Sequence, residues 1–167
     1  GIKFSGHTEY IANKCNIPKP VMMFSYKNLK IALSTVHIPL NKVPNHISIQ
    51  HSIDVLSTVV KSLKHDFNID YPKIAICGLN PHAGENGYLG CEEQTILSPA
   101  ILKTKELFPQ AQIYGPLSAD TLFYRALQGE FDIVIGQYHD QALPALKTIS
   151  FGEAVNFTMG LPIIRTS

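Results

Sequence analysis

The sequence predicts an α/β fold, with a mixed or mostly parallel sheet and flanking helices. Short apolar runs typical of buried strands alternate along the chain with longer segments whose apolar residues recur at helical spacing. The clearest strand, residues 73–77, leads directly into a glycine-rich loop over residues 78–90. Because open α/β sheets bind ligands beyond the carboxyl ends of their strands, this loop also predicts where a site lies.

Several other segments have the composition of strands. Residues 21–26 and 30–35 are separated by a short connection around Asn28, which predicts a β-hairpin. The remaining predicted strands are residues 112–114, 131–136 and 155–158, with a further strand-like run over 161–167.

The longest helix is predicted over residues 46–67. Its apolar residues recur at steps of four and three and form one stripe: Ile49, Ile53, Leu56, Val60, Leu63 and Phe67. His46, His51 and His65 fall off that stripe, so we expect these side chains to be exposed to solvent.

Two later segments also have a helical pattern. Residues 92–108 are interrupted at Ser98-Pro99, where the serine is expected to cap a new start and the proline to occupy its first turn. Residues 118–128 begin with a capping serine, and Gly129 ends that helix.

The composition is that of a soluble globular protein, and 167 residues predict a single α/β domain spanning residues 1–167. Apolar residues make up 45% of the chain and charged residues 16%. The net charge of +1 favours neither nucleic acid nor a membrane surface as a partner. No run approaches the length of a membrane span, and no signal-peptide pattern is present.

The three cysteines, Cys15, Cys77 and Cys91, lack the spacing of a metal site. Cys77 lies within an apolar strand and is expected to be a buried thiol. This usage predicts a reducing, cytoplasmic location.

The loop after residues 73–77 contains Gly84, Gly87 and Gly90, which allow positive φ and a close approach of the backbone to a ligand. The G-x-x-G-x-x-G spacing differs from the G-x-G-x-x-G fingerprint of dinucleotide sites, and no Walker loop is present. His82 and Glu85 lie in the same loop. A ligand-binding loop and a plain glycine-rich turn with an exposed histidine both fit this pattern.

Three histidines, His37, His82 and His139, each stand just beyond the end of a predicted strand. If those strands are neighbours in one sheet, the three imidazoles meet at one edge. They would then form the ligand set of a catalytic divalent-metal site with open positions. Taken singly, a histidine among apolar residues is more often structural than a ligand, and spacing along the chain does not show that the three meet.

Lys147 and Arg165 are candidates to bind a phosphate or carboxylate, or are surface charges. His7 and Thr8 stand at the start of a short helix predicted over residues 9–15, where backbone N–H groups favour anions. Taken alone, however, this stretch is more simply explained as an ordinary helix cap.

Six motifs follow one another along nearly the whole chain. They are GHTE at 6–9, VHIPL at 36–40, GLNPHAGE at 78–85, GPLSADT at 115–121, YHDQ at 138–141 and NFTMGLP at 156–162. In this order they resemble the 4-hydroxythreonine-4-phosphate dehydrogenases of pyridoxal phosphate biosynthesis.

The resemblance implies an isocitrate/isopropylmalate dehydrogenase-like α/β fold, with two domains around a cleft, in a homodimer. It also implies that His37, His82 and His139 bind a divalent metal such as zinc, magnesium or cobalt. The metal site would be completed across the dimer interface.

The resemblance also implies the reaction and its residues. The substrate-binding set would be His7, Thr8, Lys147, Asn156 and Arg165. Lys147 would also act in catalysis, together with Asp120, whose alternative role is to favour the start of a helix through its charge. The implied reaction is NAD-dependent oxidation of 4-phosphohydroxy-L-threonine at its C3 hydroxyl, followed by loss of CO2. The product is 3-amino-2-oxopropyl phosphate.

The chain begins without methionine and ends within a strand-like run, so we expect a fragment of a longer protein. The resemblance places it as the metal-binding, dimer-forming half of a two-domain dehydrogenase. Three other functions remain open from the sequence. They are a dehydrogenase of another phosphorylated hydroxy acid, a three-histidine metallohydrolase, and a non-catalytic dimerisation module.

Overall fold

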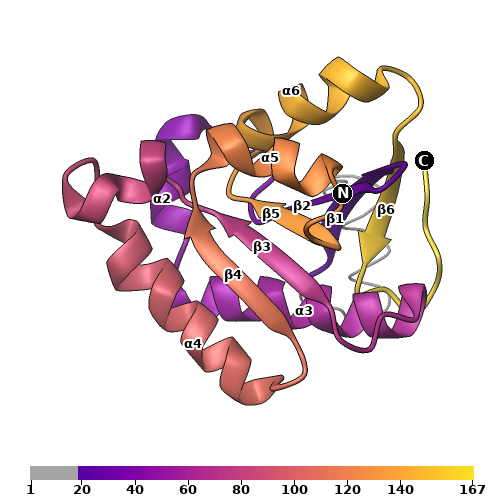
Figure 1. Ribbon diagram of the computed structural model, residues 1–167, viewed down its shortest axis with the longest axis horizontal. Helices are drawn as coiled ribbons and strands as arrows, with labels where there is room; N and C mark the ends of the chain where they lie inside the picture. Colours follow the sequence, from indigo (N-terminus) through magenta and orange to yellow (C-terminus); the bar gives the residue numbers. More distant parts are fainter. Residues whose placement is uncertain (1–18) are drawn as a thin grey trace, which may run out of the picture.

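The computed structural model describes residues 19–167, and a six-stranded sheet forms their centre (Figure 1). The strand order is β4-β3-β5-β2-β1-β6. The strands are β1 Val21–Tyr26, β2 Leu29–Leu33, β3 Lys73–Cys77, β4 Gln112–Leu117, β5 Ile133–Gly136 and β6 Val155–Met159. Each lies on a segment predicted to be extended, although β4 continues beyond Tyr114.

Strands β4, β3, β5 and β2 run parallel to one another, and β1 is antiparallel to both β2 and β6. The predicted mixed, mostly parallel sheet is therefore confirmed. The predicted hairpin also forms, since Tyr26 pairs with Leu29. Lys27 in the connecting turn has a positive φ of 50°.

Helices cover both faces of the sheet (Figure 1). They are α3 Ile49–Phe67 and α4 Ser98–Leu107 on one face, and α5 Ala119–Leu127 and α6 His139–Ser150 on the other. One apolar core includes Leu56 of α3, and the second includes Leu143 of α6. This three-layer arrangement leaves the loops that follow the parallel strands free at one edge.

The long helix begins later than predicted. Residues 40–42 and 43–46 form separate short turns, η1 (Leu40–Lys42) and α2 (Val43–His46). Helix α3 starts at Ile49 because the Ser48 hydroxyl accepts a hydrogen bond from the backbone N–H of His51 (3.1 Å). The predicted stripe is fully buried at Leu56, Val60 and Leu63, whereas Ile49 remains 42% exposed.

Of the three helix histidines, His46 and His65 are exposed as predicted, but His51 is not. Its Nε2 lies 3.0 Å from the carbonyl oxygen of Ser34, just beyond β2. Burial lowers the pKa of His51, and the bond to this carbonyl opposes the shift. The prediction was wrong here because this face of α3 packs against the loop after β2.

At Ser98-Pro99 the helix does not break but changes type, and Pro99 lies in the first turn of α4, as predicted. Residues Glu93–Leu97 form a π-helix, η3, that continues directly into α4. Ser98 has helical angles (φ −63°, ψ −46°) and is therefore not an N-cap. A wide π turn accommodates the proline because it alters the i→i−4 ladder that a proline would otherwise interrupt.

Two segments near the end of the chain also differ from expectation. Helix α6 contains Pro144 and has no counterpart among the predicted helices. Residues 161–167 are not a regular strand, and Thr166 makes an isolated bridge with Phe157. Gly160, at φ 82°, turns the chain away from β6. No helix within residues 19–167 has the length and apolar character to span a membrane.

Candidate functional site

The candidate site lies at the edge where the parallel strands end. Strands β3, β5 and β2 are neighbours, and the loops that follow them carry His82, His139 and His37 in that order. The strand ends are level, since Leu33 of β2 is opposite Gly136 of β5. The structure therefore brings the three histidine-bearing loops to one edge of the sheet.

His37 and His139 lie together at this edge. Their ring centroids are 5.7 Å apart, with the ring planes inclined by 46°. Both rings line a cavity of about 260 Å³, together with Tyr138 and Asp140. Nδ1 of His139 lies 2.6 Å from Oδ1 of Asp140, which leaves Nε2 available to a ligand.

His82 lies beside Asp120 rather than beside the other two histidines. Its Nδ1 is 4.0 Å from Oδ2 of Asp120, which stands in the first turn of α5. Both line a second cavity of about 190 Å³. Tyr138 lines this cavity as well as the first one, so the two cavities adjoin the same side chain.

The loop that carries His82, η2 (Pro81–Gly87), contains a left-handed turn. Six successive residues have positive φ, from His82 (51°) to Gly87 (96°). A non-glycine residue in this region costs roughly 1–2 kcal/mol, so the turn persists only where surrounding contacts hold it. The positive φ predicted for the loop glycines is confirmed, with Gly84 at 79°.

Two glutamines connect the loops of the site. The side-chain amide of Gln137 donates to the backbone carbonyl of Cys77 (2.7 Å), and the backbone carbonyl of Gln137 accepts from the Thr35 hydroxyl (2.7 Å). Gln141 donates to the carbonyl of Gly78 (2.8 Å) and accepts from the N–H of Gln137 (2.7 Å). These bonds tie together the chain segments beyond β2, β3 and β5. The sequence prediction missed both glutamines, and their only signal was their place on either side of His139.

Arg165 also reaches this edge. The pairing of β6 with β1, and of β1 with β2, places Thr158 level with the end of β2. Nη1 of Arg165 donates to the Thr158 hydroxyl (3.2 Å). Asn156 lies on the same face of β6 as Thr158. Its Oδ1 is buried and has no hydrogen-bond partner within the described residues.

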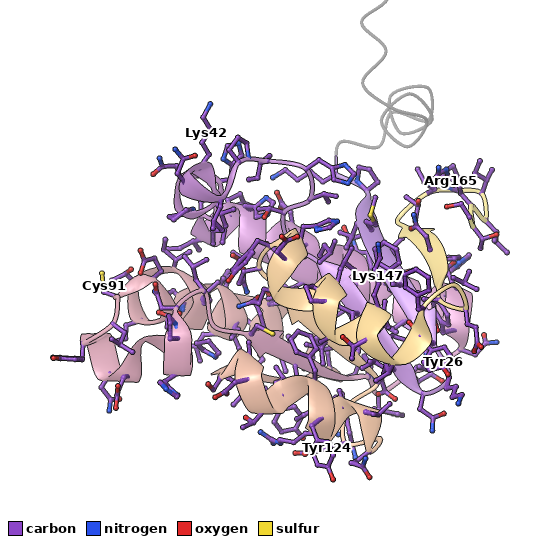
Figure 2. All side chains as sticks on the ribbon, turned by 90° about the horizontal axis from the view of Figure 1, so that it is seen from above. Tyr26, Lys42, Cys91, Tyr124, Lys147 and Arg165 are labelled. Atoms are coloured by element: carbon purple, nitrogen blue, oxygen red, sulfur yellow. The ribbon has the colours of Figure 1, made fainter. Side chains whose placement is uncertain are left out.

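Lys147 lies farther from the histidines. It is exposed in the last turn of α6, roughly two helical turns or about 12 Å along the axis from His139. It shares a face of the sheet with Asn156, because the strand partner of Asn156, Phe24, packs in the core beneath α5 and α6. Figure 2 shows Lys147 and Arg165 in the same half of the molecule, opposite Cys91.

Comparison with known proteins decides the family. All 167 residues match the family model described as pyridoxal phosphate biosynthetic protein PdxA. The chain belongs to the PdxA family. It is 46% identical over 167 residues to the 4-hydroxythreonine-4-phosphate dehydrogenase of Acidithiobacillus ferrooxidans, and 47% identical over 168 residues to that of Shewanella denitrificans. Both matches cover 100% of this chain but 50% of the relative, so the chain spans about half the length of these relatives.

Solved structures agree with this assignment. The 4-hydroxythreonine-4-phosphate dehydrogenase of Klebsiella pneumoniae superimposes with a TM-score of 0.92 at 34% identity, over 99% of this chain and 49% of that one. The enzyme of Burkholderia phymatum gives 0.91 at 37% identity, over 100% and 50%. The fold is therefore that of PdxA dehydrogenases, which is isocitrate/isopropylmalate dehydrogenase-like. A terephthalate 1,2-cis-dihydrodiol dehydrogenase of Burkholderia xenovorans shares the fold, with a TM-score of 0.85 at 22% identity.

The donor atoms at this edge fit a divalent metal in part. Imidazole nitrogen is a common ligand of zinc and other first-row transition metals. A metal-binding histidine usually donates its second ring N–H to a carboxylate, and Asp140 is in position to accept it from His139. Within residues 19–167, however, no three histidine, cysteine or acidic side chains stand close enough to hold one ion. The described part of the chain therefore presents one adjoining histidine pair, with His82 apart from it.

Two further predictions concern the binding of substrate and of NAD. His7 and Thr8, predicted to bind substrate, lie outside the described residues. For NAD, the described residues offer no strand–G-x-G-x-x-G–helix loop, so they do not fit the familiar dinucleotide mode. We therefore assign no residue to NAD.

Proposed function

We propose that this chain forms the metal-binding half of an NAD-dependent 4-hydroxythreonine-4-phosphate dehydrogenase of pyridoxal phosphate biosynthesis, active in the cytoplasm. The observation that carries the proposal is the match of all 167 residues to the PdxA family, together with histidines after three adjacent strands. The reaction oxidises the C3 hydroxyl of 4-phosphohydroxy-L-threonine, with hydride passing to NAD. The resulting β-keto acid loses CO2 to give 3-amino-2-oxopropyl phosphate.

In this proposal His37, His82 and His139 hold a divalent metal: zinc, magnesium or cobalt. When bound, such an ion acts as a Lewis acid toward the substrate oxygen at C3. Asp140 keeps the His139 ring oriented through its bond to Nδ1. Asp120, 4.0 Å from His82, is placed to orient that imidazole or to accept a proton nearby.

The substrate anion is assigned to the cationic residues. Arg165 presents a planar guanidinium suited to a phosphate or carboxylate, and its bond to Thr158 holds it at the strand edge. Asn156 and Lys147 lie on the same face and complete the described part of the set. His7 and Thr8 are proposed as further substrate ligands. Lys147 is also proposed to act in catalysis, by holding negative charge that develops on the substrate.

We also propose that the protein works as a homodimer. The separation of His82 from the other two histidines supports this idea, because a partner subunit would supply the missing ligand. In a two-fold symmetric dimer the same shared site forms twice, so each pair of subunits would hold two metal ions, one per chain.

Metal content is the direct test of this proposal. We expect about one divalent ion per chain in protein purified without chelators, and loss of that ion in His37→Ala, His82→Ala and His139→Ala. His65→Ala is the matched control, because His65 is an exposed histidine of α3 and should leave the metal content unchanged. Retention of metal by all three site variants would refute the assignment.

The reaction itself is tested by NADH formation from 4-phosphohydroxy-L-threonine, with and without added metal. Other phosphorylated hydroxy acids serve as competing substrates, and faster turnover of one of them would change the substrate assignment. Metal-dependent hydrolysis without NAD would favour a metallohydrolase. A stable dimer whose stability is unaffected by chelator and by His82→Ala would favour a non-catalytic dimerisation module.

A further inference from the structure

We propose that Glu93 is a positioning residue for His82: its buried carboxylate holds the left-handed turn that carries this imidazole. The inference rests on the proposed function only where it concerns metal binding. The part that concerns the turn rests on the geometry alone. Glu93 begins the π-helix η3 and lies on a different element from the histidine it serves.

The carboxylate contacts the chain just before the turn. Oε1 of Glu93 accepts a hydrogen bond from the backbone N–H of Asn80 (2.8 Å), and Oε2 accepts one from the side-chain amide of Asn80 (3.1 Å). Asn80 directly precedes η2, and its carbonyl accepts from the N–H of Ala83 (3.2 Å). Both carboxylate oxygens therefore hold the residue from which the left-handed turn departs.

The same carboxylate also contacts the centre of the turn. A Cβ added to Gly84 would lie 2.6 Å from Oε2 of Glu93, and one added to Gly78 would lie 3.0 Å from Oε1. The absence of side chains at these glycines thus creates the space that the carboxylate fills. Gly84 also has φ 79°, a backbone angle that favours glycine. Glycine is therefore needed at this position both for the backbone conformation and for the close approach of Glu93.

Glu93 is 3% exposed, which is unusual for a carboxylate. Within residues 19–167 no lysine, arginine or histidine pairs with it. Its charge is instead compensated by N–H donors of Asn80. A buried carboxylate held in this way is sensitive to the loss of either donor, since each oxygen has its own fixed partner.

The consequence for His82 follows from its place in the turn. It is the first residue with positive φ and stands two positions after Asn80. If the turn relaxes to right-handed angles, the His82 side chain changes direction and leaves its place beside Asp120. Glu93 therefore decides where this imidazole points without touching it.

The test compares Glu93→Gln with Glu92→Gln. Glutamine at 93 keeps the shape but replaces one accepting oxygen with a donor, so one bond to Asn80 is lost. Glu92 accepts from the same Asn80 amide (2.8 Å) but is only partly buried, and it is the matched control. Hydrogen exchange of residues 81–89 reports on the turn, with α3 as an internal reference. Titration with Co²⁺ reports affinity, and its visible spectrum reports imidazole ligation.

In Glu93→Gln we expect exchange over residues 81–89 to be about tenfold faster, with α3 unchanged. We expect Co²⁺ affinity to fall roughly 10–100-fold, the usual effect of losing a residue that orients a metal ligand. Glu92→Gln should change neither. Unchanged exchange in Glu93→Gln overturns the proposal.

Faster exchange with unchanged Co²⁺ affinity also overturns the positioning role, because the turn would then be held for stability alone. If wild-type protein takes up no Co²⁺, the proposed function fails. The exchange comparison then still decides whether Glu93 holds the turn. The two failures are therefore distinguishable.

Discussion

At the scale of single residues, the glycines of this chain show that positive φ and close contact are separate requirements. Gly84 and Gly129 have nearly the same φ, 79° and 84°. A Cβ at Gly84 would meet Glu93 Oε2 at 2.6 Å and the Gly90 carbonyl at 2.7 Å, whereas a Cβ at Gly129 would have nothing within 4 Å. The pair thus separates the backbone effect from the steric one.

We therefore expect Gly129→Ala to lower the free energy of unfolding by about 1 kcal/mol, through φ alone. Gly84→Ala should cost about 2–5 kcal/mol, since overpacking adds to the backbone effect. Urea denaturation of both variants measures the difference. If both variants lose the same free energy of unfolding, the loop can shift to make room for a methyl group, and the Glu93 carboxylate is not held in a fixed position.

At the scale of elements, the link between α3 and the loop after β2 depends on one partly buried histidine. The backbone carbonyl of Ser34 accepts a hydrogen bond from Nε2 of His51 (3.0 Å), and Ser34 stands three residues before His37. The Ser34 hydroxyl lies 3.2 Å from the same nitrogen. Helix α3 is thereby tied to the chain segment that leads into the candidate site.

This link predicts a pH dependence of stability. Burial lowers the pKa of His51 below its ordinary value of 6.5, so the unfolded chain takes up this proton more readily than the folded one. The contribution of His51 is therefore present above pH 6.5 and is lost as pH falls through the lowered pKa. The free energy of unfolding, measured in urea across this range, should decrease on acidification.

His51→Gln should remove that part of the pH dependence, because glutamine can donate to the Ser34 carbonyl but does not titrate. His65→Gln, at an exposed position of the same helix, should leave the profile unchanged. A wild-type profile in His51→Gln would assign the acid sensitivity to another group.

At the scale of the whole molecule, the candidate site exists because of strand order. His37, His82 and His139 are far apart in sequence, but β2, β5 and β3 are neighbours, and their loops meet at one edge. The Gln137 and Gln141 bonds then fix these loops against one another. A metal held by these histidines, with one of them supplied by a partner subunit, would connect loops that follow these strands, so its removal should affect the stability of the whole fold.

Chelation should therefore lower the melting temperature of the metal-loaded protein. A ligand at about 100 times its Kd contributes about 2.7 kcal/mol, which corresponds to a shift of roughly 5–10 °C for a chain of this size. His139→Ala should melt at one temperature with or without chelator. If chelator leaves the melting temperature of the wild-type protein unchanged, metal binding at this site does not contribute to the stability of the fold.

The sequence by itself determined the strands, the mixed sheet and the family, because these depend on local apolar pattern and on motifs, and it proposed the candidate residues of the site. It did not determine the continuous π-helix at Glu93, the partial burial of His51 or the glutamine bonds between loops. Those features depend on contacts between segments distant in the chain. Tertiary structure alone decided that His37 and His139 adjoin while His82 lies with Asp120, since strand order and a left-handed turn set the direction of each loop.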